Sequence, residues 1–230
     1  EGKYDLARQY FNKALEIKPD MPTTMYNLGL VLVAQGKHER AFELYAQALS
    51  LQPDDPAPLN NWGLALMDQR RYTEAIEKYD EAIRVDSDFS TAYFNKGLAL
   101  RGLDRLDESV KQFEETVRLD PEFRKARFIL GMERMREQRF EEAAKHLAIV
   151  ARMHPDQSEI LTQYGLALEK TGRLNEAIVQ FREVLRLEPN HEKAKEGLDR
   201  VKKSLDESGG TRVENLERGI GSATGVKDIP

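Results

Sequence analysis

Three asparagines stand 34 residues apart, at Asn27, Asn61 and Asn95. A side-chain amide carries both a donor and an acceptor, so it can pair with the backbone of an extended peptide whatever that peptide's sequence. Ile129 and Gln163 take the next two positions of the series. The spacing therefore predicts a ladder of three amides on a binding surface, and different binding beyond it. The alternative is that each amide bonds a neighbouring helix or faces water.

Basic side chains are concentrated between residues 124 and 157, where eight Lys or Arg residues stand against five Asp or Glu. Such a patch can pair with the carboxylates of an acidic partner. We expect Arg101, Lys125 and Arg136 to point toward the same surface as the asparagines. The alternative is a solvated charged face, because exposed charges seldom contribute much.

No residue pattern supports catalysis or a bound cofactor. The histidines show no metal-ligand spacing, and no nucleophile, base and oxyanion-binding group form a set. The glycine-rich segment 219–225 superficially resembles a phosphate-binding loop, but no strand precedes it and no basic helix follows. We therefore expect a protein that is not an enzyme and that holds no cofactor and no metal.

Composition narrows the class of partner. The chain has 230 residues, 40% of them hydrophobic, and a net charge of -5, which opposes broad attraction to nucleic-acid phosphates. It has no cysteine and so no disulfide. No apolar run approaches the roughly 18 residues of a membrane-spanning helix. We expect a soluble segment that binds no nucleic acid and does not insert into a membrane. The compartment stays open, with the cytoplasm as the default.

A period of 34 residues organises the chain, because five interleaved series keep this step. The glycines are Gly29, Gly63, Gly97, Gly131 and Gly165. A small residue recurs at Ala7, Ala41, Ala75, Ser109, Ala143 and Ala177. A large one follows it at Phe11, Tyr45, Tyr79, Phe113, Leu147 and Phe181. The fourth series begins at Ala14, and a proline series begins at Pro19.

Each class of residue has a physical reason to recur. Two packed helices need small side chains where they touch and a large one to fill the remaining gap. Proline cannot continue a helix, so it ends each pair of helices. Apolar spacing supports two helices in each unit and no strand. The pattern predicts an all-α fold.

The segment 60–66, Asn-Asn-Trp-Gly-Leu-Ala-Leu, followed by Tyr72-Thr-Glu-Ala-Ile76, resembles the signature of the tetratricopeptide repeat family. The resemblance covers residues 1 to about 205. It implies an α-solenoid of stacked antiparallel helix pairs, a right-handed superhelix with a concave groove. We expect a half repeat at 1–21, five repeats at 22–55, 56–89, 90–123, 124–157 and 158–191, a capping helix at 192–205, and a flexible tail at 206–230.

The family resemblance also implies a function. Its members bind peptides on the concave side, which the first helix of each repeat lines. The three asparagines are similar to the amide rows of O-linked N-acetylglucosamine transferase repeats. Chaperone-binding members grip a terminal carboxylate with Lys, Asn and Arg, and here Asn60, Asn95 and Lys125 match that set poorly, because Leu64 and Ile129 stand where polar residues are needed.

The sequence favours a scaffold that holds an extended segment of a partner protein. One alternative is that the repeats recruit substrates for a larger enzyme such as a glycosyltransferase. Another is self-assembly through the apolar face of residues 1–21, which includes Tyr4, Leu6, Ala7, Phe11 and Ala14. We also expect the tail 206–230 to dock, through Val213, Leu216 and Ile220, in the groove of its own or a neighbouring molecule.

Overall fold

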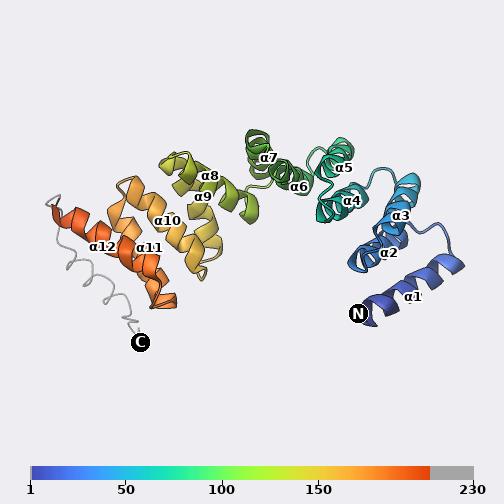
Figure 1. Cartoon of the computed structure of the whole chain (residues 1–230), viewed down its shortest axis with the longest axis horizontal. Coiled ribbons are helices and arrows are strands. Elements are labelled where there is room, and N and C mark those ends of the chain that lie inside the picture. Colours follow the sequence, from blue (N-terminus) through green and yellow to red (C-terminus); the bar gives the residue numbers. More distant parts are fainter. Residues whose placement is uncertain (1, 208–230) are drawn as a thin grey trace, which may run out of the picture. The chain divides into compact units, whose positions relative to one another are not determined.

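The computed structural model describes residues 2–207, which form twelve α-helices and no strand (Figure 1). The predicted all-α fold is confirmed. The docking predicted for Val213, Leu216 and Ile220 lies outside the described residues. The helices are α1 Gly2–Ile17, α2 Pro22–Ala34, α3 His38–Leu51, α4 Ala57–Asp68, α5 Tyr72–Val85, α6 Ser90–Gly102, α7 Leu106–Leu119, α8 Arg124–Arg136, α9 Phe140–Met153, α10 Ser158–Lys170, α11 Leu174–Leu187 and α12 Glu192–Glu207.

The chain divides into two compact units, Glu1–Ala126 and Arg127–Pro230, called unit 1 and unit 2 below. Within unit 1, each helix from α1 to α7 packs against the next one, and α4 also contacts both α2 and α6. Within unit 2, α10 contacts α9, α11 and α12. The first helices of successive pairs therefore lie side by side in unit 1, and we call the surface of α2, α4 and α6 the first-helix face.

Each pair is closed by a large side chain that lies against a glycine of the partner helix. A Cβ atom built on Gly97 would come within 2.6 Å of the Phe113 ring, and one on Gly165 within 2.7 Å of the Phe181 ring. Both rings are fully buried. Only a residue without a Cβ fits this approach, so the recurring glycines and aromatics are explained by one contact.

The turn within each pair needs a left-handed backbone at one position. Glycine supplies it at Gly36 and Gly172, with φ of 73° and 75°. Arg70, Asp104 and Gln138 adopt the same conformation at the corresponding places, with φ near 60°. A side chain is unfavourable there, so the flanking helices must hold these three turns in place.

The two terminal helices differ in how well they are covered. In α12, Ala194, Leu198 and Val201 are buried against the preceding pair, and the rest of the helix surface is largely charged. This helix ends at Glu207, and it covers the apolar side of its neighbours. In contrast, α1 has no buried residue, and Tyr10 and Ile17 are 65% and 78% exposed.

Candidate protein-binding surfaces

Two of the three predicted ladder residues, Asn95 and Asn61, bond the preceding first helix. Asn95 of α6 is buried, and its Nδ2 donates a hydrogen bond of 2.8 Å to Oδ1 of Asn60 on α4, which is also buried. Their burial places this bond inside the contact between two first helices. This bond joins Asn60 and Asn95 across the helix contact, and the two side chains are only 5% and 6% exposed.

Asn61 makes the corresponding contact one repeat earlier. Its Nδ2 donates to the hydroxyl of Tyr26 on α2, at 2.9 Å, and to the backbone carbonyl of Ala57, also at 2.9 Å. Both hydrogens of this amide are therefore used. The pKa of the Tyr26 hydroxyl is raised, mainly by burial and also by the negative charge of Asp55. Tyr26 is therefore neutral when it accepts the hydrogen bond from Asn61.

The expected row of three free amides is therefore corrected. In both observed pairs the asparagine bonds the side chain 35 residues before it, which belongs to the preceding first helix. Asn27 is half-buried. It is the one member of the three with no side-chain partner among residues 2–207. Beyond the series, Gln163 donates to Glu159 of its own helix at 2.7 Å.

A row of leucines, which the sequence analysis missed, lies on the first-helix face. Leu30, Leu64 and Leu98 each follow a recurring glycine directly. Leu30 is 36% exposed, and the other two are half-buried. We call these three residues the leucine row. Their shared spacing of 34 residues was available as a signal, but an apolar residue beside a packed glycine suggested core rather than surface.

Other apolar groups extend the leucine row. Val33 and Met67 stand three residues after Leu30 and Leu64, on the same helical faces, and both are half-buried. Met67 Sδ accepts a hydrogen bond of 3.2 Å from the Tyr79 hydroxyl, which fixes its side chain. The first-helix face of unit 1 is therefore apolar along its middle.

The predicted basic residues are at the surface, in two units. In unit 1, Arg101 is at the end of α6 and Lys125 in the first turn of α8, and both are exposed. Arg101 stands three residues after Leu98, at the end of the leucine row. Arg136 belongs to unit 2, and its Nη2 pairs with Glu133 Oε2 at 2.7 Å. Arg136 is therefore already neutralised within its own helix.

One buried charge in unit 2 was also missed. Arg134 is 5% exposed at a position where Leu32, Leu66, Leu100 and Leu168 fill the core of the other pairs. Its guanidinium lies 2.8 Å from a carboxylate oxygen of Glu137 and 3.6 Å from one of Glu142. The fourth pair, α8 with α9, therefore has one charged side chain at a core position that is a leucine in the other pairs.

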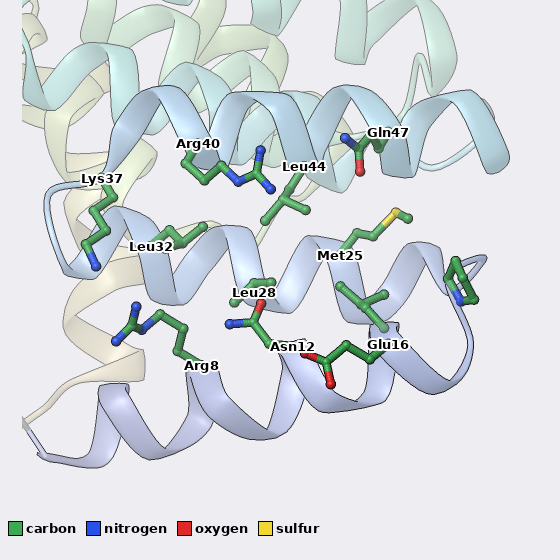
Figure 2. Close-up of a pocket in the computed structure, with 12 residues that line it drawn as sticks. Arg8, Asn12, Glu16, Met25, Leu28, Leu32, Lys37, Arg40, Leu44 and Gln47 are labelled. Carbon is green, nitrogen blue, oxygen red and sulfur yellow. The ribbon is translucent and has the colours of Figure 1, made fainter.

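A groove with a volume of about 590 Å³ opens between α1 and α3, with α2 at its base (Figure 2). We call it the N-terminal groove. Leu28 and Leu32 line its base, while Arg8 and Arg40 lie on opposite walls. Arg8 pairs with Asp5 at 3.3 Å, and Arg40 pairs with Glu43. The walls are thus mostly polar and internally paired.

A second groove, of about 580 Å³, lies at the corresponding place in unit 2, between α9 and α11 with α10 at its base. We call it the C-terminal groove. Leu161 and Tyr164 line its base, and Ala148, Ala151 and Val179 line its walls. Most of this surface is apolar. Arg152, Arg182 and Arg186 lie along its edge with Glu183.

In the repeats of unit 1 that follow the N-terminal groove, the positions that correspond to Ala148 and Tyr164 lie beside larger or charged groups. Trp62 stacks on Phe42 with ring centroids 5.2 Å apart, and Lys78 lies 4.5 Å from the Trp62 centroid. One repeat later, Lys96 pairs with Asp80 at 2.6 Å, across α6 and α5. The side chains at these positions, rather than the backbone, therefore decide whether a groove is open in a given repeat.

The described residues contain no cluster of His, Asp or Glu that could hold a metal ion. Within residues 2–207, no helix is both long and apolar enough to cross a membrane.

Comparison with known proteins agrees with this repeat architecture. Chains of similar fold include YrrB, described as a TPR protein with an unusual peptide-binding site (22% identity, TM-score 0.60, 81% of this chain and 96% of that one). PilF of Pseudomonas aeruginosa has 23% identity and a TM-score of 0.68 over 85% of this chain and 89% of its own. MamA has 22% identity and a TM-score of 0.59 over 75% and 94%. The comparison with curated proteins gives no match.

Sequence profiles of the tetratricopeptide repeat match residues 60–122 and 128–192, and a further one matches residues 1–54. Together they cover most of the helical array, and the first alone spans more than half of the chain. The chain belongs to the tetratricopeptide repeat family.

Proposed function

We propose that the chain is a protein-binding scaffold, and that the leucine row of unit 1 holds an extended segment of a partner protein. Tetratricopeptide repeats generally mediate contacts between proteins, and YrrB is described as having a peptide-binding site. The observation that carries the proposal is one apolar position that is at least partly exposed in three successive repeats, at Leu30, Leu64 and Leu98.

The leucine row suits an extended apolar segment for a physical reason. Its three leucines come from three helices that lie side by side, so a straight segment that crosses the helices meets one leucine per repeat. Burying a leucine side chain contributes about 1.5–3 kcal/mol. Three such contacts can therefore support binding, once the cost of ordering the segment is subtracted.

Polar groups near the row supply direction. Arg101, beside Leu98, and Lys125, at the start of α8, are exposed and suit carboxylates at one end of the segment. Asn27, the asparagine without a side-chain partner among residues 2–207, suits a backbone amide at the other end. Asn61 and Asn95 act differently in this proposal, because they hold the first helices together.

Photo-crosslinking tests the proposal by position. Benzoylphenylalanine replaces Leu30 or Leu64 in the full chain, and Leu103 serves as the control because it has the same 36% exposure as Leu30 but lies outside the row. We expect Leu30 and Leu64 to crosslink to one contiguous segment of the same partner, and Leu103 to miss it. Equal crosslinking from all three positions would overturn the proposal.

Self-association is a second candidate, favoured by the uncovered α1. Tyr4, Leu6, Tyr10 and Ile17 are all 49% exposed or more on this one helix. Light scattering at several concentrations tests it. A mass that rises with concentration, and that falls back in the Tyr10→Ser variant, supports association through α1, whereas a constant monomer mass contradicts it.

A further inference from the structure

The C-terminal groove has an exposed apolar wall that its counterparts lack. Val179 on α11 is 56% exposed. The corresponding positions in the preceding second helices are occupied by charged residues, namely Glu43, Glu77, Lys111 and Lys145. A single exposed valine is common on protein surfaces, but Val179 lines the same groove as Ala148, Ala151 and Tyr164, so the four form one apolar surface.

The C-terminal groove is open because it lacks an ion pair that unit 1 has at the corresponding positions. In unit 1, Asp80 and Lys96 form an ion pair of 2.6 Å across the corresponding place. Ala148 and Tyr164 stand 68 residues later, at the same two positions. An alanine and a neutral ring replace the ion pair, and a volume of about 580 Å³ remains. This volume falls within the range of about 300–1,000 Å³ that is usual for ligand sites.

The edge of the groove is positively charged. Arg186 forms a two-pronged contact with Glu183, with its Nη2 at 2.6 Å and its Nε at 2.9 Å from the carboxylate oxygens. Arg152 is exposed and has no ion-pair partner among residues 2–207. Because Arg186 is paired with Glu183, the positive charge of Arg152 is what this edge offers to the carboxylates of a partner.

The helices that line the groove favour a helical rather than an extended bound segment. Both walls and the base are helices, whose backbone N–H and C=O groups are bonded within each helix. Unlike the leucine row, this groove has a helix on each side, so an extended strand lying in it over Ala148, Ala151 and Val179 would turn its peptide groups toward apolar walls rather than toward water. A helix satisfies its own backbone, and it can place one apolar side in a groove between two helices.

We propose that the C-terminal groove binds a short acidic amphipathic helix of a partner protein. Apolar side chains of that helix lie on Val179, Ala148 and Tyr164, and its carboxylates face Arg152 and the Arg186 edge. This site is separate from the leucine row, and the proposal does not depend on the proposed function of that row.

A peptide titration with the full chain tests the proposal. The probe is a fluorescent peptide of about 14 residues, or four helical turns, with leucines on one face and glutamates on the other. Its partner probe has lysine in place of every glutamate. We expect the glutamate peptide to bind about tenfold more tightly, with the difference shrinking as salt is added.

Variants at one exposed position locate the site. Val179→Glu should weaken binding of the glutamate peptide by about tenfold, because it removes the apolar contact and repels the acidic face. Val179→Lys should cost less, because it restores the attraction while removing the same valine. Lys111→Glu, the same charge at the corresponding position of α7 in unit 1, should leave the affinity unchanged. Both positions are exposed, and circular dichroism checks that each variant keeps its helix.

A second variant closes the base of the groove. Ala148→Asp with Tyr164→Lys transfers the Asp80–Lys96 ion pair into unit 2 and should also reduce binding. Equal affinity for the two peptides, or unchanged affinity in Val179→Glu, would overturn the proposal. A synthetic peptide of residues 208–230 that displaces the probe would also overturn it, because the groove would then suit the chain's own segment.

Discussion

Units 1 and 2 are built from the same helix pair but use different side chains to join one pair to the next. In unit 1, asparagine side chains connect successive first helices, as in the Asn95–Asn60 bond of 2.8 Å. Unit 2 has Gln163 at the corresponding place, and it bonds Glu159 of its own helix. In both units a first helix also contacts a helix two elements along, as α4 contacts α6 and α10 contacts α12, whereas the side chains at the asparagine position differ.

The grooves show the same difference. The N-terminal groove has arginines on opposite walls, Arg8 and Arg40, each paired with an acid of its own helix. The C-terminal groove has Ala148 where the first has Asn12, and Val179 where the first is flanked by Glu43. Repeat proteins can therefore acquire separate binding sites by substitution at exposed positions, without changing the contacts that stack the repeats.

The largest expected effect comes from exchanging the core residues of the two units. Leu100→Arg should lower the free energy of unfolding by about 3–5 kcal/mol, because it buries a charge without a dedicated acid. At the place where unit 2 has Glu137 beside Arg134, unit 1 has Leu103. Urea unfolding measures the loss.

The reverse exchange, Arg134→Leu, is the matched control. Its acids, Glu137 and Glu142, have side chains 34% and 43% exposed, so they can stay hydrated after the arginine is removed. We expect stability to be unchanged or higher. Equal losses for Leu100→Arg and Arg134→Leu would contradict this account, because they would mean that Arg134 and its acids stabilise their pair as much as Leu100 stabilises its own.

A smaller effect separates the asparagines. Asn95→Ala should cost about 1–3 kcal/mol, because it leaves the buried Oδ1 of Asn60 without its donor. Asn27→Ala should change stability by less than about 0.5 kcal/mol. Thermal or urea unfolding of both variants gives the comparison. A loss from Asn27→Ala as large as that from Asn95→Ala would contradict the stacking role.

The double variant sharpens this result. Asn60→Ala with Asn95→Ala removes both members of the bond and leaves no orphaned group. Its cost should be less than the sum of the two single losses. Strict additivity would mean that the two amides do not stabilise each other.

The next effect concerns a hydroxyl. Tyr45 is fully buried and its OH has no hydrogen-bond partner among residues 2–207, whereas the Tyr79 hydroxyl donates to Met67. Val33 stands where the later repeat has Met67, which explains the difference. Tyr45→Phe, which gives the ring found at Phe181 in unit 2, should raise stability by about 1 kcal/mol. Tyr79→Phe should not, and a gain in both variants would contradict this account.

The smallest effect is a pH dependence confined to unit 2. Burial lowers the pKa of His146, and the positive charges of Arg127 and Arg134 lower it further, although Glu142 opposes this shift. The folded state therefore binds a proton less readily than the unfolded chain, whose histidine pKa is about 6.5. Stability should be fully present above that pH and should fall as the pH drops below it.

His146→Gln is the control for this pH dependence. It should remove the acid-dependent loss below about pH 6.5, measured as the change in urea midpoint. Hydrogen exchange should place the loss in α9. The same acid-dependent loss in the variant would assign it to other groups.

Size and spacing carried the predictions that the structure confirms. A glycine opposite an aromatic, as in Gly97 with Phe113, leaves one way to pack two helices, and the 34-residue period then predicts an all-α array. The orientation of the asparagine side chains could not be predicted from size and spacing. Asn61 and Asn95 can point to solvent or to the preceding helix, and the choice depends on Tyr26 and Asn60, 35 residues earlier.

The apolar surfaces escaped the sequence analysis for a related reason. Leu64 follows a buried glycine, and periodicity alone does not tell a core leucine from one at the edge of a helix contact. The C-terminal groove is formed by three helices. Only the structure shows that Ala148, Tyr164 and Val179, one from each helix, line the same groove. Val179 nevertheless left a signal, since every earlier counterpart from position 43 onward is charged.

The most direct test of the binding account is the affinity of the crosslinked partner segment, made as a synthetic peptide, for two leucine variants of equal exposure. Leu30 and Leu103 are each 36% exposed, and only Leu30 belongs to the leucine row. Calorimetric titration should show binding weakened by about tenfold in Leu30→Glu and unchanged in Leu103→Glu. Equal affinities for the two variants would contradict a binding site on the first-helix face.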